Sequence, residues 1–201
     1  MDLKSHIIIV NLIADILEKQ IDIKIDRDTL EFGAVYPDIN LPKRVRIHNT
    51  KQVYNNYQKQ TNNLINKNKN KFGISFSLGM LCHYICDSFC WAHNMRMATF
   101  GDFKKHVKYE KSLAKHLDQY TISNDVSKVI IENIFRCTDF DIFDFLNEYK
   151  SEYLKKSSWD DIFNQHKIDT EFAIICSTII LMGFIYELEM AECSAVEVLH
   201  I

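Results

Sequence analysis

The stretch GMLCHYICDSFCWAHN, residues 79–94, decides what kind of fold this sequence encodes. Most of its side chains are apolar, and the spacing predicts a long buried helix over Phe72–His93. Within it, His83 and Asp87 are four residues apart. On a helix this spacing separates two side chains by about 40° around the axis and by one turn. We therefore expect the imidazole and the carboxylate to point the same way.

A second pair with the same spacing follows in HVKYE, residues 106–110, where His106 precedes Glu110. His93 lies between the two pairs. On a continuous helix it would face roughly 120° away from Asp87. His93 therefore either follows a helix end or serves a different ion from His83. Imidazole and carboxylate ligands in this pattern favour a borderline divalent metal, above all zinc.

Two other interpretations compete with a histidine metal site. A single His-x-x-x-acid pair often occurs by chance, and its His is then a buried core residue. Cys82, Cys86 and Cys90 recur at every fourth position and could form a cysteine site, although small apolar residues packing a buried face are the stronger reading. Three cysteines on one helix cannot all pair with one another. The six cysteines therefore predict reduced thiols rather than a disulfide framework.

Composition narrows the class of protein. With 5 Gly and 2 Pro among 201 residues, the chain favours helices over a loop-rich β fold. A formal net charge of −3 gives no electrostatic case for binding nucleic acid. The first residues lack a basic region followed by an apolar run, so we expect no signal peptide and a cytoplasmic protein.

The most apolar segment, Phe172–Tyr186, is shorter than the roughly 20 residues that span a bilayer. We expect a buried core helix and no transmembrane segment, with a membrane-facing role as the alternative. Ser5 is a candidate N-cap, and Tyr36 before Pro37 predicts an extended or looped segment around Asp38. The chain is expected to form one domain, residues 1–201, as an all-α bundle of about seven helices with a metal cluster in a cleft. The expected helices cover residues 7–19, 50–69, 72–93, 103–116, 126–137, 141–155 and 170–192, with a short helical turn at 28–32.

The order of candidate ligands resembles the zinc-dependent phospholipase C family, which includes bacterial phosphatidylcholine-cleaving enzymes and the clostridial alpha-toxin. The fungal single-strand nucleases are more distantly similar. The resemblance covers roughly the first 115 residues and rests on these motifs: SHIIIVN (residues 5–11) with Asp15-Ile16, Tyr36-Pro37-Asp38, His48, LGMLCHYICD (residues 78–87) with His93, and HVKYE (residues 106–110).

The resemblance implies two to three zinc ions in one cleft. Asp38, His48, His83 and Asp87 would hold one ion, and His93, His106 and Glu110 a second. His6 and a bridging Asp87 would hold the third, with the amine and carbonyl of the first residue. That residue is Trp in the family and Met1 here, which is the main departure. A neutral α-amine can still serve as a nitrogen ligand.

The expected activity is hydrolysis of a phosphodiester by zinc-activated water, with Asp38 orienting or deprotonating that water as its family counterpart is proposed to do. A phospholipid substrate would bring the protein into peripheral contact with a membrane. One alternative is a single-strand nuclease, although Glu110 in the last pair favours the phospholipase branch. Another is a metal-stabilised binding protein without turnover. Tyr84, Asn94 and Asn11 are expected to surround the ligands.

Overall fold

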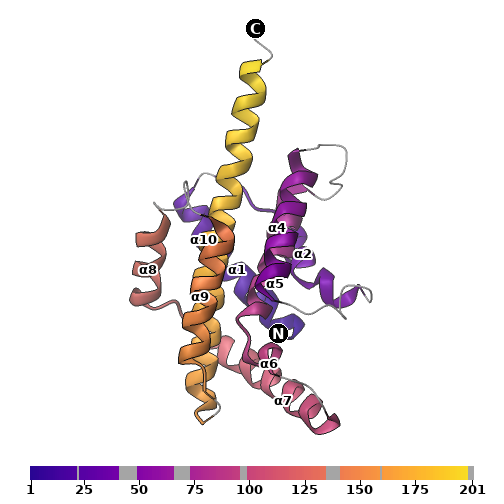
Figure 1. Cartoon of the computed structure of the whole chain (residues 1–201), viewed down its shortest axis with the longest axis vertical. Coiled ribbons are helices and arrows are strands. Elements are labelled where there is room, and N and C mark those ends of the chain that lie inside the picture. The colour runs from indigo at the N-terminus through magenta and orange to yellow at the C-terminus, as the bar shows by residue number, and fades with distance from the viewer. Residues whose placement is uncertain are drawn as a thin grey trace.

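We analysed a computed structural model of the protein, which describes residues 1–21, 23–40, 49–65, 73–95, 99–134, 141–158 and 160–198. Over these residues the chain forms nine helices and no strand, which confirms the all-α prediction (Figure 1). The helices, labelled as in Figure 1, are α1 (Leu3–Gln20), α2 (Arg27–Ile39), α4 (Thr50–Ile65), α5 (Gly73–Ser88), α6 (Trp91–Asn94), α7 (Phe100–Leu117), α8 (Asn124–Ile134), α9 (Ile142–Lys156) and α10 (Ile162–Val198).

Helix α5 is the centre of the core. Every residue from Ser75 to Ser88 is buried, because α1, α2, α4 and α10 pack around this helix. The cysteines of α5 are buried and free, and Cys82 Sγ lies 3.6 Å from Cys86 Sγ. This arrangement agrees with reduced thiols that pack a helix face.

Helix α10 also contributes to the core, and its C-terminal end extends beyond the other helices (Figure 1). By length and composition alone, Ile162–Ala191 is apolar enough to cross a membrane. However, 83% of its apolar window is buried inside the protein, as expected of a core helix. The helix begins earlier than the predicted residue 170, and Gln165, His166 and Asp169 in its early turns are buried.

Two glycines allow α2 and α5 to approach closely. A Cβ added at Gly79 would lie 2.1 Å from the carbonyl oxygen of Leu30, and one at Gly33 would lie 2.3 Å from that of Phe76. Both distances are far below a normal van der Waals contact. This close contact brings the backbone of α2 within hydrogen-bonding reach of α5 side chains.

The prediction of an extended segment at Tyr36–Pro37 is wrong. Pro37 lies inside α2, which continues to Ile39 and is followed by Asn40, whose N–H donates to the carbonyl of Tyr36 at 3.0 Å. Proline within a helix loses one backbone hydrogen bond. Here the close packing of α2 against α5 holds the helical conformation.

The prediction of one helix over residues 72–93 is also wrong, because α5 ends at Ser88. Phe89 and Cys90 turn tightly, and Cys90 adopts an extended conformation before α6. Ser5 is not the N-cap of α1; Asp2 is, and its carboxylate accepts from the N–H of Ser5 at 2.9 Å. The helix count exceeds seven because α2 and α6 are helices in their own right. His48 and residues 66–69, the end of the helix predicted over residues 50–69, lie outside the described residues.

Candidate metal centre

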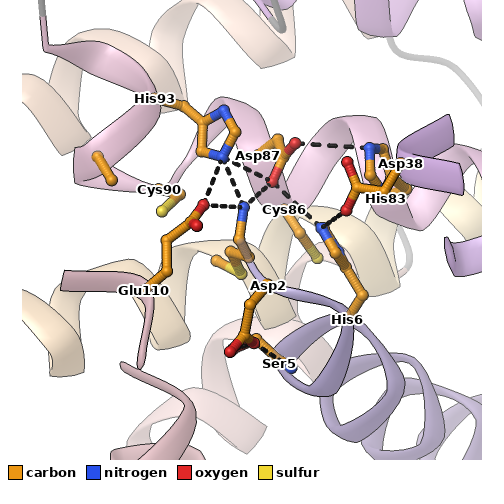
Figure 2. A network of polar contacts seen from close by, with 12 residues as sticks. Asp2, Ser5, His6, Asp38, His83, Cys86, Asp87, Cys90, His93 and Glu110 are labelled. Carbon is orange, nitrogen blue, oxygen red and sulfur yellow. Dashed lines mark hydrogen bonds and ion pairs between the residues drawn. The ribbon is translucent and has the colours of Figure 1, made fainter. Parts of the chain in front are cut away.

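Seven candidate ligand side chains from the five helices α1, α2, α5, α6 and α7 converge at one place. Figure 2 shows Asp87 in the middle, with His93 and Glu110 on one side and His6 and His83 on the other. His83 and Asp87 both project from α5 toward this point, as their spacing predicts. Two groups of donors can be distinguished, and in each group the donor atoms lie within 4.8 Å of one another.

The first group consists of His6, His83 and Asp87, all fully buried. His6 Nε2 lies 3.2 Å from Asp87 Oδ1, and His83 Nε2 lies 3.5 Å from Asp87 Oδ2. The rings of the two histidines stack with their centroids 4.2 Å apart. The first turn of α1 thus places His6 against the C-terminal half of α5.

The second group consists of His93, His106 and Glu110. The Nε2 atoms of both histidines lie 3.1 Å from Glu110 Oε1. His93 Nε2 is also 3.4 Å from Asp87 Oδ1, which connects the two groups. His93 follows the end of α5 and also belongs to a different group from His83. Both possibilities raised by its spacing are therefore met.

The α-amine of Met1 lies between the two groups and is fully buried. It contacts Asp87 Oδ1, lies 2.6 Å from His93 Nε2 and 3.3 Å from Glu110 Oε1. Burial opposes its charge, but Asp87, Cys90 and Glu110 together outweigh this effect and raise the pKa of the amine well above its usual value. The amine therefore stands among the donor atoms rather than in solvent.

Backbone carbonyls fix the orientation of two candidate ligand rings. His83 Nδ1 donates to the carbonyl of Ala34 at 2.8 Å, and His106 Nδ1 donates to that of Ala92 at 3.0 Å. In both cases the Nδ1–H is used and the Nε2 atom faces the carboxylates. This is how metal-binding histidines are commonly oriented. No sequence pattern marks these carbonyls, because they come from other helices.

The electrostatics of the cluster keep its acids ionised. Burial disfavours the charge of Asp87, but His93, the α-amine, His83 and His6 outweigh it and hold the pKa of Asp87 well below its usual range. The pKa of Glu110 is likewise lowered, against the effect of burial, by bonds with His106 and His93. Burial lowers the pKa of His6, yet Asp87 raises it to about 9.

The donor set fits zinc. His6 is fully buried, and although its Nε2 is close to Asp87, neither ring nitrogen makes a hydrogen bond of acceptable geometry. A buried polar group without a hydrogen bond costs free energy, so its retention calls for another partner. Imidazole nitrogens beside carboxylates are a ligand set that zinc prefers.

The model of the family described as zinc dependent phospholipase C matches residues 5–160 of the chain. The chain belongs to this family. No curated protein and no solved structure matched the chain. The zinc-dependent character of the family agrees with the two groups of donors, and all candidate ligands except Met1 lie within the matched residues.

Asp38 stands at the edge of the candidate metal centre. It is in the last turn of α2, its side chain is 22% exposed, and its Oδ2 lies 4.0 Å from His6 Nε2. It is the least buried of the described carboxylates at the centre. Its predicted role as a ligand, and that of His48, which is outside the described residues, stay predictions.

The three residues expected to surround the ligands differ in their position. The ring of Tyr84 packs edge-on against His83 with centroids 5.3 Å apart. Asn94 donates to the carbonyls of Ser88 and Cys90 and so braces the turn between α5 and α6. Asn11 instead links α1 to α2 by donating to Glu31 at 2.7 Å.

Proposed function

We propose that the chain is a phosphodiester hydrolase of the phospholipase C type, in which a metal-activated water attacks phosphorus. The observation that carries the proposal is the position of Asp87. Its Oδ1 faces His6 and His93, and its Oδ2 faces His83. A carboxylate shared in this way can hold two ions close enough together to act on one phosphoryl group.

Zinc ions held by these groups would lower the pKa of a bound water toward neutrality and offset the charge that develops on the phosphoryl oxygens. The chain contributes the rigidity of the arrangement. The Ala34 and Ala92 carbonyls hold the rings of His83 and His106, and the side chains of the first group are buried in the surrounding core. The ligands are thus positioned before any substrate arrives.

Asp38 is proposed as the acid that orients or deprotonates the attacking water. Its partial exposure supports this role, because a general base must be reached by water, whereas Asp87 is fully buried. Its Oδ2 is close to His6 Nε2 and therefore faces the first group of ligands.

A phospholipid is the proposed substrate, with peripheral contact between the protein and the membrane. Ile39 directly follows Asp38 and is 53% exposed, and Leu3 beside the N-terminus is 44% exposed. Exposed apolar side chains next to site residues suit an amphiphile. The formal net charge of −3 offers no attraction for a polyanion such as single-stranded DNA.

The test is hydrolysis of p-nitrophenylphosphorylcholine, followed by the release of p-nitrophenol. We expect activity that is lost on chelation and restored by zinc. Asp38→Asn should lower kcat by about 10²–10⁴-fold, with the zinc content of the variant measured in parallel. Asp28→Asn, the same change at an exposed position of α2, is the matched control and should leave kcat unchanged.

Two outcomes would contradict the proposal. Bound zinc without turnover of any phosphodiester would favour a metal-stabilised binding protein. Degradation of single-stranded DNA, without cleavage of phosphatidylcholine vesicles, would favour the nuclease alternative. An Asp38→Asn variant with the wild-type rate would remove Asp38 from the mechanism while leaving the zinc chemistry in place.

A further inference from the structure

A buried carboxylate outside the candidate ligands lies beneath the second group. Asp169 is on α10, beyond the residues that match the family, and is fully buried. Its Oδ2 accepts from the N–H of Trp91 and the hydroxyl of Tyr109, both at 2.8 Å. Its Oδ1 accepts from the hydroxyl of Tyr153 at 2.9 Å and from Gln165 Nε2 at 2.6 Å. Four donors occupy the acceptor positions of an ionised carboxylate.

The bond to Trp91 N–H supports helix α6. This helix has only four residues, and its N-cap Cys90 makes no side-chain capping bond. A single turn is not stable by itself, because its nucleation costs more than its few hydrogen bonds return. Asp169 supplies the missing acceptor from another helix. His93 lies two residues after Trp91, so this bond fixes the turn that carries the first ligand of the group.

The bond to Tyr109 supports helix α7. Tyr109 directly precedes Glu110, and His106 is one turn earlier on the same helix. The hydroxyl of Tyr109 reaches the same Oδ2 atom that holds Trp91. One oxygen therefore ties together the two helices that provide all three ligands of the second group.

We propose that Asp169 is a positioning residue for the zinc site formed by His93, His106 and Glu110. The inference depends on one part of the proposed function, which is that this group binds zinc. Burial raises the pKa of Asp169 to about 6, against the effect of its hydrogen bonds. At pH 7 the ionised form still prevails, so both oxygens are available as acceptors.

The network itself provides a matched pair of variants. Tyr109→Phe and Tyr153→Phe each remove one buried hydroxyl that donates to Asp169. Tyr109 is on the helix that carries His106 and Glu110, whereas Tyr153 is on α9, which carries none of the candidate ligands. A merely structural network would make the two changes equivalent.

The experiment measures zinc affinity by competition with a chromophoric chelator, together with the urea unfolding midpoint. We expect the two Tyr variants to lose similar stability. Only Tyr109→Phe should weaken one equivalent of zinc by about 10-fold or more, and Asp169→Asn should weaken the same equivalent by about 10–100-fold. The visible spectrum of the cobalt-substituted protein should change in Tyr109→Phe and Asp169→Asn but not in Tyr153→Phe.

Equal zinc affinities in the two Tyr variants, or full wild-type affinity in Asp169→Asn, would overturn the proposal. If Asp169→Asn does not fold, the two Tyr variants still decide the question. A wild-type protein that binds zinc but hydrolyses nothing would overturn the proposed function alone, because affinity is the readout here. A wild-type protein that binds no zinc would overturn both.

Discussion

His6 Nε2 lies 3.2 Å from Asp87 Oδ1, although one residue belongs to the first turn of α1 and the other to the last turn of α5. This contact brings the start of the chain against the most buried helix. Both side chains are fully buried in the protein. An ion between them would satisfy His6, so the contact connects the fold to the chemistry proposed for the zinc centre.

The first prediction concerns the two acids of the centre. Asp87→Asn should release more zinc than Glu110→Gln, because Asp87 faces histidines of both groups whereas Glu110 Oε1 faces the histidines of one. Metal analysis after dialysis measures the difference. Glu31→Gln, which alters an acid bonded to Asn11, is the control and should keep the wild-type zinc content. Equal zinc loss in both site variants would contradict a bridging role for Asp87.

The second prediction concerns the α-amine of Met1. Its contacts with Asp87 and Glu110 place it among the donor atoms, and an amide nitrogen would bind zinc poorly. A short peptide added before Met1 should therefore remove about one zinc and much of the activity, while helical content is retained. The same peptide added at the C-terminus is the control. Wild-type zinc content in the N-terminally extended protein would show that the amine is not a ligand.

The third prediction tests the contact between α2 and α5. Gly79→Ala should destabilise the protein by about 2–4 kcal/mol, because the added methyl group would overlap the carbonyl of Leu30. Gly101→Ala is the matched control, since its nearest neighbour would be 3.5 Å away, and should be neutral or slightly stabilising. Urea unfolding measures both. A Gly79→Ala protein as stable as the wild type would show that the helices separate at little cost.

The fourth prediction concerns pH and His166, which is buried on α10 beside Ser112 and Tyr109. Burial, with a further effect of His116, lowers the pKa of His166 to about 4. Between pH 6.5 and 4, His166 therefore binds a proton in the unfolded chain but stays neutral in the native protein. The contribution of His166 to the free energy of unfolding is therefore complete above pH 6.5. It decreases as pH falls toward 4, by at most about 1.4 kcal/mol per pH unit.

His166→Gln should remove this part of the pH dependence. The measurement is urea unfolding of wild-type and variant proteins in parallel between pH 7 and 4. The zinc ligands contribute equally to the unfolding free energy of both proteins, so their contribution cancels in the difference between the two values. A difference that does not change with pH would show that His166 titrates normally in the folded protein.

Local spacing was sufficient to predict much of the centre. The four-residue intervals of His83–Asp87 and His106–Glu110 act within one helix, so each pair faces one point in the structure as expected. The position of His93 could be narrowed to two possibilities because its angle on a continuous helix is fixed by geometry alone.

Features that depend on distant residues could not be predicted in this way. Pro37 suggested an extended chain, but the Gly33–Gly79 contact, which forms between separate helices, holds α2 in its helical form. The N–H of Trp91 at the start of α6 donates to Asp169, which is far away in sequence. His166 and Asp169 carried no motif, since their role arises from burial against α6 and α7.

The His6–His83–Asp87 and His93–His106–Glu110 groups are each proposed to hold zinc. An anomalous difference map, recorded at the zinc absorption edge from crystals of the zinc-loaded protein, tests this most directly. We predict two or three peaks, with at least one inside each group and a further one beside the Met1 amine if it is a ligand. A well-ordered protein with no peak in these groups, or with peaks only elsewhere, would show that neither group is a zinc site.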